Sequence, residues 1–164
     1  MNKLKYKFGP WAIVTGASSG IGKEFARQLA AQGFNLFLFA RRENLLEKLR
    51  HELTRNFGVN VEYKKLDLTQ SDFITEIENS TKSSDVRLLI SNAGAAHMGA
   101  FTKIAINDLQ SMVNLNVSAQ LALSHWFTNR LISKKVQGGL LLVSSSIAYQ
   151  GTPYAANYSA AKAY

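Results

Sequence analysis

Trp11-Ala-Ile-Val-Thr15 runs directly into Gly16-Ala-Ser-Ser-Gly20-Ile-Gly22, and this junction decides the fold. The first five residues are apolar enough for a buried strand. Lys23–Gln32 has the composition of a helix that ends at Gly33. A glycine-rich turn between a strand and a helix lets the backbone approach a pyrophosphate, to which the helix start presents free N–H groups. The junction therefore predicts a dinucleotide-binding turn, with a plain tight connection as the alternative.

Strand-like and helix-like segments alternate along the rest of the chain. The expected strands are 35–40, 59–63, 86–90 and 139–143, and the expected helices are 43–55, 71–81 with Ser71 as its candidate cap, and about 106–134. Repeated strand–helix units of this length imply right-handed crossovers and a parallel sheet with helices on both faces. We therefore expect an α/β protein with a Rossmann-like, doubly wound parallel sheet of about five strands, in a single domain over residues 1–164.

Composition argues against several classes of function. The chain has 46% hydrophobic and 18% charged residues, which is typical of a globular domain. The net charge of +8 allows an anionic ligand, but the basic residues are scattered without a nucleic-acid-binding module, so we expect no nucleic-acid partner. Because there is no cysteine and no ligand-like pattern around the histidines, we expect no metal site. The chain also lacks a signal-peptide core and an apolar run of about 20 residues, so we expect a cytoplasmic protein without a membrane span.

Tyr158 and Lys162 have i, i+4 spacing shortly before Tyr164, the last residue of the sequence. If the segment is helical, both side chains lie on one face. An ammonium group beside a phenol stabilises the phenolate, so the pair is a candidate proton donor with its partner. Tyr and Lys at this spacing also occur on ordinary solvated helix faces, so the pair predicts chemistry only in combination with the glycine-rich turn.

Two further polar features are candidates for a site. Ser144, Ser145 and Ser146 follow the end of the expected fifth strand. Asn116 lies within the longest expected helix, where asparagine is unfavourable, and Asn114 competes for the same role. By themselves, the serines fit an ordinary polar loop, and an asparagine in a helix fits a side chain bonded to a neighbouring carbonyl.

Three ordered motifs resemble the signatures of the short-chain dehydrogenase/reductase family, classical type. They are Thr15-Gly-Ala-Ser-Ser-Gly-Ile-Gly22, Asn92-Ala93-Gly94 after the fourth strand, and Tyr158-x-x-x-Lys162. They extend over nearly the whole chain, which is similar to roughly the first two thirds of a typical member. The resemblance implies a nicotinamide dinucleotide bound by Gly16, Ser18, Ser19, Gly20, Ile21, Gly22, Asn92, Ala93, Gly94, Tyr158 and Lys162.

The residues after the second expected strand bear on which dinucleotide is bound. Arg41 and Arg42 lie about twenty residues beyond the glycine turn, where an acidic residue would accept the 2′-hydroxyl of NAD. An arginine can instead bind a 2′-phosphate by charge-assisted hydrogen bonds. NADP(H) is therefore the expected cofactor, with Arg41 as the predicted contact and a solvated basic helix start as the alternative. By the resemblance, Asp67 and Leu68 contact adenine, although Asp67 ahead of Thr69 also fits a turn.

The resemblance also implies a division of catalytic roles. Tyr158 donates a proton to the developing alkoxide while hydride passes from the nicotinamide to a carbonyl carbon. Ser145, whose spacing from the tyrosine matches the family, orients the carbonyl, and either neighbouring serine would replace it if the loop differed by one residue. Lys162 promotes the proton transfer and binds the nicotinamide ribose, and Asn116 holds a water that links the lysine to solvent.

Full-length family members continue beyond this region. We therefore expect an incomplete domain whose fifth strand is a sheet edge with exposed apolar surface. The first hypothesis is a fragment of a carbonyl reductase that acts on a ketone or 3-oxoacyl-like substrate. The second is a truncated, inactive product that serves as a nucleotide-binding or assembly module. We expect negligible carbonyl reductase activity from the 164-residue chain alone, and we expect homo-oligomers of the intact family member rather than of this chain.

Overall fold

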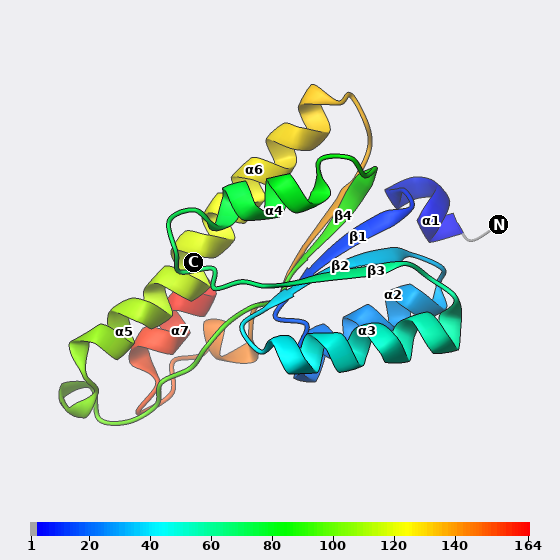
Figure 1. Ribbon diagram of the computed structural model, residues 1–164. Coiled ribbons are helices and arrows are strands. Elements are labelled where there is room, and N and C mark those ends of the chain that lie inside the picture. The colour runs from blue at the N-terminus through cyan, green and yellow to red at the C-terminus, as the bar shows by residue number, and fades with distance from the viewer. Residues whose placement is uncertain (1–2) are drawn as a thin grey trace.

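Five largely apolar runs form a parallel sheet at the centre of the structure, a computed structural model that describes residues 3–164 (Figure 1). The strands are β1 (Trp11–Thr15), β2 (Asn35–Ala40), β3 (Val61–Lys65), β4 (Val86–Ser91) and β5 (Gly139–Leu142). Their spatial order is β3-β2-β1-β4-β5, and every neighbouring pair is parallel. The expected α/β class and doubly wound sheet are confirmed. The expected domain begins at residue 1, but residues 1 and 2 lie outside the described part.

Helices cover both faces of this sheet, and others lie beyond its edge. The helices of the described residues are α1 (Lys3–Phe8), α2 (Gly20–Ala31), α3 (Glu43–Phe57), α4 (Phe73–Thr81), α5 (Ile106–Val113), α6 (Ala119–Ser133) and α7 (Ala156–Ala163). Two single 3₁₀ turns, Phe101–Lys103 and Ser146–Ala148, and one π-helical turn, Asn114–Ser118, complete the list. Helices α2 and α3 pack on one face, and α4 and α6 pack on the other (Figure 1).

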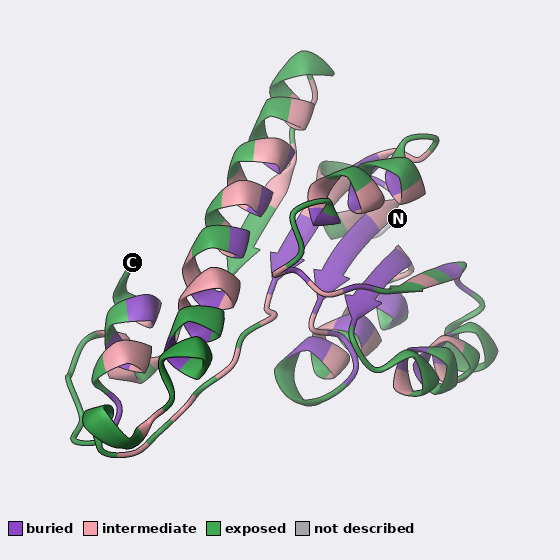
Figure 2. Ribbon diagram, turned by 60° about the vertical axis from the view of Figure 1, so that its left-hand side comes forward, coloured by how far each residue is buried: buried purple, intermediate pink, exposed green. Residues whose placement is uncertain are grey.

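The central strands are buried because their alternate residues face two separate cores. Ala12 and Val14 pack with the residues of α2 and α3, whereas Ile13 packs with those of α4 and α6. All three are fully buried, and Figure 2 shows the central strands as the most continuously buried part of the chain. Burial of one large aliphatic side chain contributes about 1.5–3 kcal/mol, so this two-sided core holds the strand ends in place.

Several expected boundaries were wrong by a few residues. Helix α2 begins at Gly20 rather than Lys23, because the amide of Lys23 already donates to the carbonyl of Ser19 at 3.3 Å. Strand β3 is 61–65 rather than 59–63, because Leu36 of β2 pairs with Val61. Its polar end looks like a loop in the sequence, but an edge strand tolerates such residues.

Helix boundaries differ in the same way. Ser71 is not a cap: Asp72 occupies the N-cap position of α4, which begins at Phe73. Helix α3 continues to Phe57 and ends where Gly58 adopts a left-handed φ of 66°. The long helix expected over 106–134 consists of α5, the π-helical turn and α6, and helix α1 was not expected from the sequence.

Strand β5 is the edge strand next to β4, as expected. Leu140, Leu141 and Leu142 are 37%, 37% and 45% exposed, so apolar side chains do lie on this edge. Within residues 3–164, no helix has both the length and the apolar character needed to cross a bilayer.

Candidate functional site

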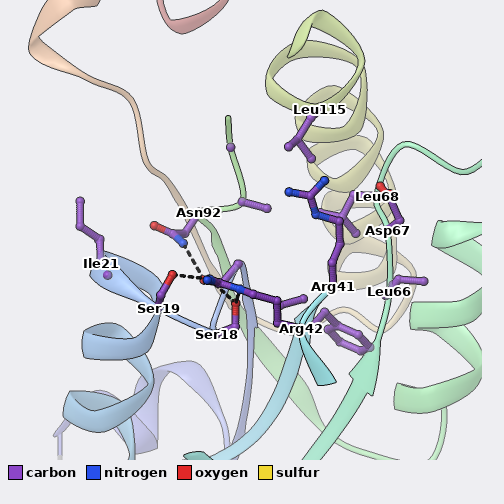
Figure 3. A pocket seen from close by; sticks show the side chains of 16 residues that line it. Ser18, Ser19, Ile21, Arg41, Arg42, Leu66, Asp67, Leu68, Asn92 and Leu115 are labelled. Atoms are coloured by element: carbon purple, nitrogen blue, oxygen red, sulfur yellow. Dashed lines mark hydrogen bonds between the residues drawn. The ribbon is translucent and has the colours of Figure 1, made fainter. Parts of the chain in front are cut away.

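The carboxyl ends of β1 to β4 open onto a cleft of about 650 Å³ (Figure 3). The strand order reverses between β1 and β4, and doubly wound sheets bind ligands at such a point. The cleft is lined by Gly16, Ser18, Ser19, Gly20, Ile21, Phe39, Ala40, Arg41, Arg42, Leu66, Asp67, Leu68, Asn92, Ala93, Gly94 and Leu115. All residues expected to bind a dinucleotide are among them except Gly22, Tyr158 and Lys162.

The glycine-rich turn brings backbone close to backbone at the floor of this cleft. Gly16 has a φ of 66°, and a Cβ atom there would lie 2.8 Å from Nδ2 of Asn92 and 2.9 Å from Cα of Ala93. Gly22 lies against the same Asn92 amide and against the carbonyl of Gly16, so a side chain at this position would also displace the turn. A Cβ on Gly20, the first residue of α2, would meet no atom within 4 Å. The N-terminus of α2 is thus unobstructed at the cleft, which suits a phosphate.

The hydroxyl of Thr15 joins the two loops that form the cleft floor. It accepts hydrogen bonds from the amides of Asn92 at 3.0 Å and Ala93 at 3.1 Å, and it donates to the carbonyl of Ile90 at 3.4 Å. The side-chain amide of Asn92 donates back to the carbonyl of Thr15 at 3.1 Å. Because Thr15 is fully buried, these contacts fix the glycine turn relative to the loop after β4.

A guanidinium group lies beside the serines of the glycine-rich turn. Arg42 donates to the hydroxyl of Ser18 from Nε at 3.2 Å and from Nη2 at 2.9 Å, and to the hydroxyl of Ser19 at 2.5 Å (Figure 3). Arg41, the predicted contact, also lines the cleft, but its side chain points toward Leu115 and Leu68 (Figure 3). The structure therefore groups Arg42 with the serine hydroxyls in a cluster of hydrogen-bond donors.

Asp67 forms a turn and also lines the cleft, while its expected contact with adenine stays a prediction. Its Oδ1 accepts from the amide of Thr69 at 3.0 Å and from the hydroxyl of Thr69 at 2.8 Å, which makes it a turn residue. It also lines the cleft together with Leu66 and Leu68. The turn fixes the carboxylate at the end of the cleft that lies beyond β3.

Asn116 is buried within the π-helical turn between α5 and α6. Its Oδ1 accepts from the amide of Ala95 at 3.0 Å, and its Nδ2 donates to the carbonyl of Ala95 at 2.7 Å. A π-helical turn is a rare local widening that often occurs at functional sites. Asn114, the competing candidate, accepts from Gln110 on the exposed side of the helix instead.

Gly94 lies between Asn116 and Lys162. A Cβ atom on Gly94 would lie 2.9 Å from Oδ1 of Asn116 and 3.3 Å from Nζ of Lys162. The ammonium group of Lys162 donates to the carbonyl of Val143 at 2.9 Å, and burial lowers the pKa of this lysine. The absence of a side chain at Gly94 therefore lets two expected catalytic residues both approach this glycine, which itself lines the cleft.

Tyr158 and Lys162 lie on one face of α7, as their spacing predicts, and both are partly buried. Among residues 3–164, the Tyr158 hydroxyl has no hydrogen-bond partner. The hydroxyl of Ser145 accepts from the amide of Ile147 at 3.4 Å and caps the 3₁₀ turn, whereas the hydroxyl of Ser144 donates to the carbonyl of Lys162 at 2.7 Å. The serine loop therefore lies beside α7, but it makes no hydrogen bond with Tyr158 itself.

Four lining residues were not anticipated as parts of a site: Phe39, Ala40, Leu66 and Leu115. The first three lie at or just beyond the carboxyl ends of β2 and β3. The rule that ligands bind at these ends could have found them. Leu115 carries no signal of its own, because its position depends on the π-helical turn. Thr15 was quoted only as the start of the motif, and its linking role requires the three-dimensional structure.

The arrangement fits a dinucleotide. The turn offers close backbone approach and an unobstructed helix N-terminus, and the cleft contains two arginines and a single carboxylate. An anionic ligand is thereby favoured. Within the described residues, no three His, Cys, Asp or Glu side chains gather as metal ligands.

Comparisons with known proteins agree with this geometry. Residues 10–164 match the family model described as short chain dehydrogenase. A very-long-chain 3-oxoacyl-CoA reductase of Laccaria bicolor is 34% identical over 100% of this chain and 49% of its own length. The chain spans about half the length of the curated relatives it matches.

Two solved structures resemble the fold closely. A 7β-hydroxysteroid dehydrogenase superposes with a TM-score of 0.92 at 28% identity, over 99% of this chain and 62% of that one. A short-chain dehydrogenase from Sphingobium yanoikuyae in complex with NADPH superposes with a TM-score of 0.87 at 30% identity, over 94% of this chain and 61% of that one.

Proposed function

Since the chain belongs to the short-chain dehydrogenase family, we propose that it forms the coenzyme-binding and catalytic part of an NADP(H)-dependent oxidoreductase. The proposed reaction is hydride transfer between the nicotinamide and a carbonyl or alcohol substrate. The observation that carries the choice of coenzyme is the Arg42 guanidinium beside the hydroxyls of Ser18 and Ser19.

The preference for NADP(H) over NAD(H) follows from charge. A 2′-phosphate placed at this cluster would receive charge-assisted hydrogen bonds from Arg42 and neutral ones from the serines. The ribose 2′-hydroxyl of NAD(H) gains less from a guanidinium, and the cluster contains no carboxylate to accept from it. The NADPH complex of the relative from Sphingobium yanoikuyae is consistent with this preference.

The test is a comparison of NADPH and NADH binding, measured by fluorescence titration of the purified chain. Hydrogen bonds to charged groups contribute about 1.5–3 kcal/mol, so Arg42→Ala should weaken NADPH binding roughly tenfold or more and change NADH binding little. Arg55→Ala is the matched control, because it removes the same charge at an exposed position of α3 that does not line the cleft, and Arg41→Ala measures separately the contact that the sequence favoured. Equal losses for both coenzymes in Arg42→Ala would contradict the proposed role.

In the proposed reaction, a residue of α7 donates the proton that the alkoxide receives. Bound in the cleft, the nicotinamide would supply or accept the hydride. Tyr158 donates a proton from its hydroxyl to the developing alkoxide, and the nearby Lys162 ammonium stabilises the phenolate left behind. Ser145 orients the carbonyl oxygen, and Asn116 contributes to a proton path from Lys162 to solvent.

The proposed substrate is a ketone or a 3-oxoacyl-like carbonyl compound. Its basis is the name of the relative from Laccaria bicolor, a very-long-chain 3-oxoacyl-CoA reductase. Because the chain spans about half of that relative, substrate and activity are proposed for the whole protein, and so is the formation of a homo-oligomer. The alternative of an inactive nucleotide-binding module is not favoured, since relatives such as the reductases of Laccaria bicolor and Pyrenophora tritici-repentis carry enzyme names at 34% identity, whereas a human relative named as inactive is 29% identical.

A further inference from the structure

The segment after β5 contacts Lys162 at two atoms. The amide of Val143 donates to the carbonyl of Ser91 at 3.0 Å and so continues the pairing of β5 with β4. The carbonyl of the same Val143 accepts from Nζ of Lys162 at 2.9 Å. The hydroxyl of the next residue, Ser144, donates to the backbone carbonyl of Lys162 at 2.7 Å. Side chain and main chain of the lysine are thus bound by consecutive residues of one sheet-anchored segment.

These two contacts differ in what they can fix. A lysine side chain has several rotatable bonds, so a bond to Nζ alone does not fix the helix that carries it. The bond from Ser144 acts on the main chain and ties the turn of α7 that carries Lys162 to the segment after β5.

We propose that Ser144 is a positioning residue: its hydroxyl holds the main chain of Lys162 so that the ammonium group stays on Val143 and beside Gly94 and Asn116. The role in catalysis rests on the function proposed above, but the placement of the lysine does not. Ser144 is distinct from its neighbour Ser145, whose hydroxyl accepts from Ile147 and is expected to contact substrate.

The consequence for Lys162 is measurable without turnover. Burial lowers the pKa of this lysine, because a low-dielectric surrounding disfavours the charged ammonium. If the bond from Ser144 is lost, the main chain at Lys162 can move away from the segment after β5 and water can reach Nζ. The pKa of Lys162 then rises toward that of a free lysine. Ser144 itself is exposed, so the global free energy of unfolding should change little.

The experiment titrates the ε-methylene carbon of Lys162 by NMR in the 164-residue chain, with the signal assigned from Lys162→Arg. Ser144→Ala should raise the pKa of Lys162, and Ser144→Thr, which keeps a hydroxyl, should restore it. Ser146→Ala is the matched control, because Ser146 lies in the same loop and makes no side-chain hydrogen bond within residues 3–164. Urea unfolding of each variant checks that the fold is retained.

An unchanged titration of Lys162 in Ser144→Ala, or an equal shift in Ser146→Ala, would overturn the proposal. If Ser144→Ala does not fold, Ser144→Cys replaces it. A thiol is a weaker donor than a hydroxyl, so a smaller upward shift is expected, and no shift would be contradictory. A failure of the coenzyme proposal would appear in a different measurement: the unmodified chain would not bind NADPH.

Discussion

At the scale of single residues, the Thr15 hydroxyl connects the two loops that form the cleft floor. This hydroxyl accepts hydrogen bonds from two backbone amides and donates one to a backbone carbonyl, and Thr15 is fully buried. A buried amide that loses its acceptor costs far more than an average hydrogen bond contributes. The position of the glycine-rich turn therefore depends on a side chain that does not itself line the cleft.

Thr15→Val should destabilise the chain by roughly 1–3 kcal/mol, because valine has a similar shape but leaves the amides of Asn92 and Ala93 without their acceptor. The measurement is the free energy of unfolding in urea. Thr15→Ser, which keeps the hydroxyl, serves as the control and should lie closer to the unmodified chain. Equal stability of Thr15→Val and the unmodified chain would refute the linking role.

Tyr158 carries the proposed proton transfer, so its hydroxyl should matter for turnover and not for coenzyme binding. In the active protein, Tyr158→Phe should lower kcat by about 100-fold or more, the range of general acid catalysis. NADPH affinity, measured by fluorescence titration, should stay nearly unchanged. Tyr6→Phe, the same change at an exposed tyrosine of α1 away from α7, is the control. A Tyr158→Phe variant that retains kcat would exclude this tyrosine as the acid.

The presence of two adjacent arginines after β2 could be predicted from the sequence, but the direction of each side chain could not. The sequence placed a basic pair after β2 and thereby indicated a phosphate, but it favoured Arg41. In the structure, Arg42 holds the N-cap position of α3 with an extended backbone, and its side chain is the one that contacts Ser18 and Ser19. Which of two neighbours points toward a turn depends on where the helix begins. That boundary is uncertain by one or two residues in any sequence argument.

At the scale of elements, buried segments were predicted best. The bounds of β1 and β2 agree with the sequence analysis because both strands are buried on two faces and appear as uninterrupted apolar runs. β3 was misplaced because it is an edge strand with largely exposed residues. The π-helical turn was not anticipated as such, although the asparagine at its centre marked the place. Its geometry depends on the bonds between Asn116 and Ala95.

Helices α2 and α3 are joined by a bidentate ion pair. Arg27 donates to Oε1 of Glu52 from Nε at 2.6 Å and to Oε2 from Nη2 at 3.1 Å. The hydrogen bond from Arg27 lowers the pKa of Glu52. A carboxyl group with a lowered pKa in the folded state stabilises the fold above its unfolded pKa of about 4.3, and this contribution is lost as the pH falls through the folded pKa.

Glu52→Gln should therefore reduce the free energy of unfolding by up to about 1 kcal/mol at neutral pH, as expected for a partly exposed pair. The difference from the unmodified chain should shrink as the pH falls below about 4. Urea unfolding at neutral pH and at a pH below about 4 measures this difference in the free energy of unfolding. Glu47→Gln, an exposed change on the same helix, should show a smaller effect. A deficit of Glu52→Gln that grows in acid would contradict the assignment.

At the scale of the whole molecule, the sheet order brings separate segments of sequence to one cleft. The glycine turn, the arginines after β2, Asp67 and Asn92-Ala93-Gly94 meet because four parallel strands end at the same edge. This convergence was predictable from the alternation of strands and helices. The contact between the segment after β5 and Lys162 was not, because neither residue type signals it. The cytoplasmic location expected from the sequence stays a prediction.

The central claim is that this cleft binds a nicotinamide dinucleotide with a 2′-phosphate. The most direct measurement is an NMR titration of the ¹⁵N-labelled chain with NADPH, and in parallel with NADH, that follows every backbone amide. We expect saturable shifts concentrated at residues 16–22, 41–42, 66–68 and 92–94, with saturation at lower concentration for NADPH. Shifts that do not saturate, that lie mainly outside these segments, or that are equal for both coenzymes would contradict the account.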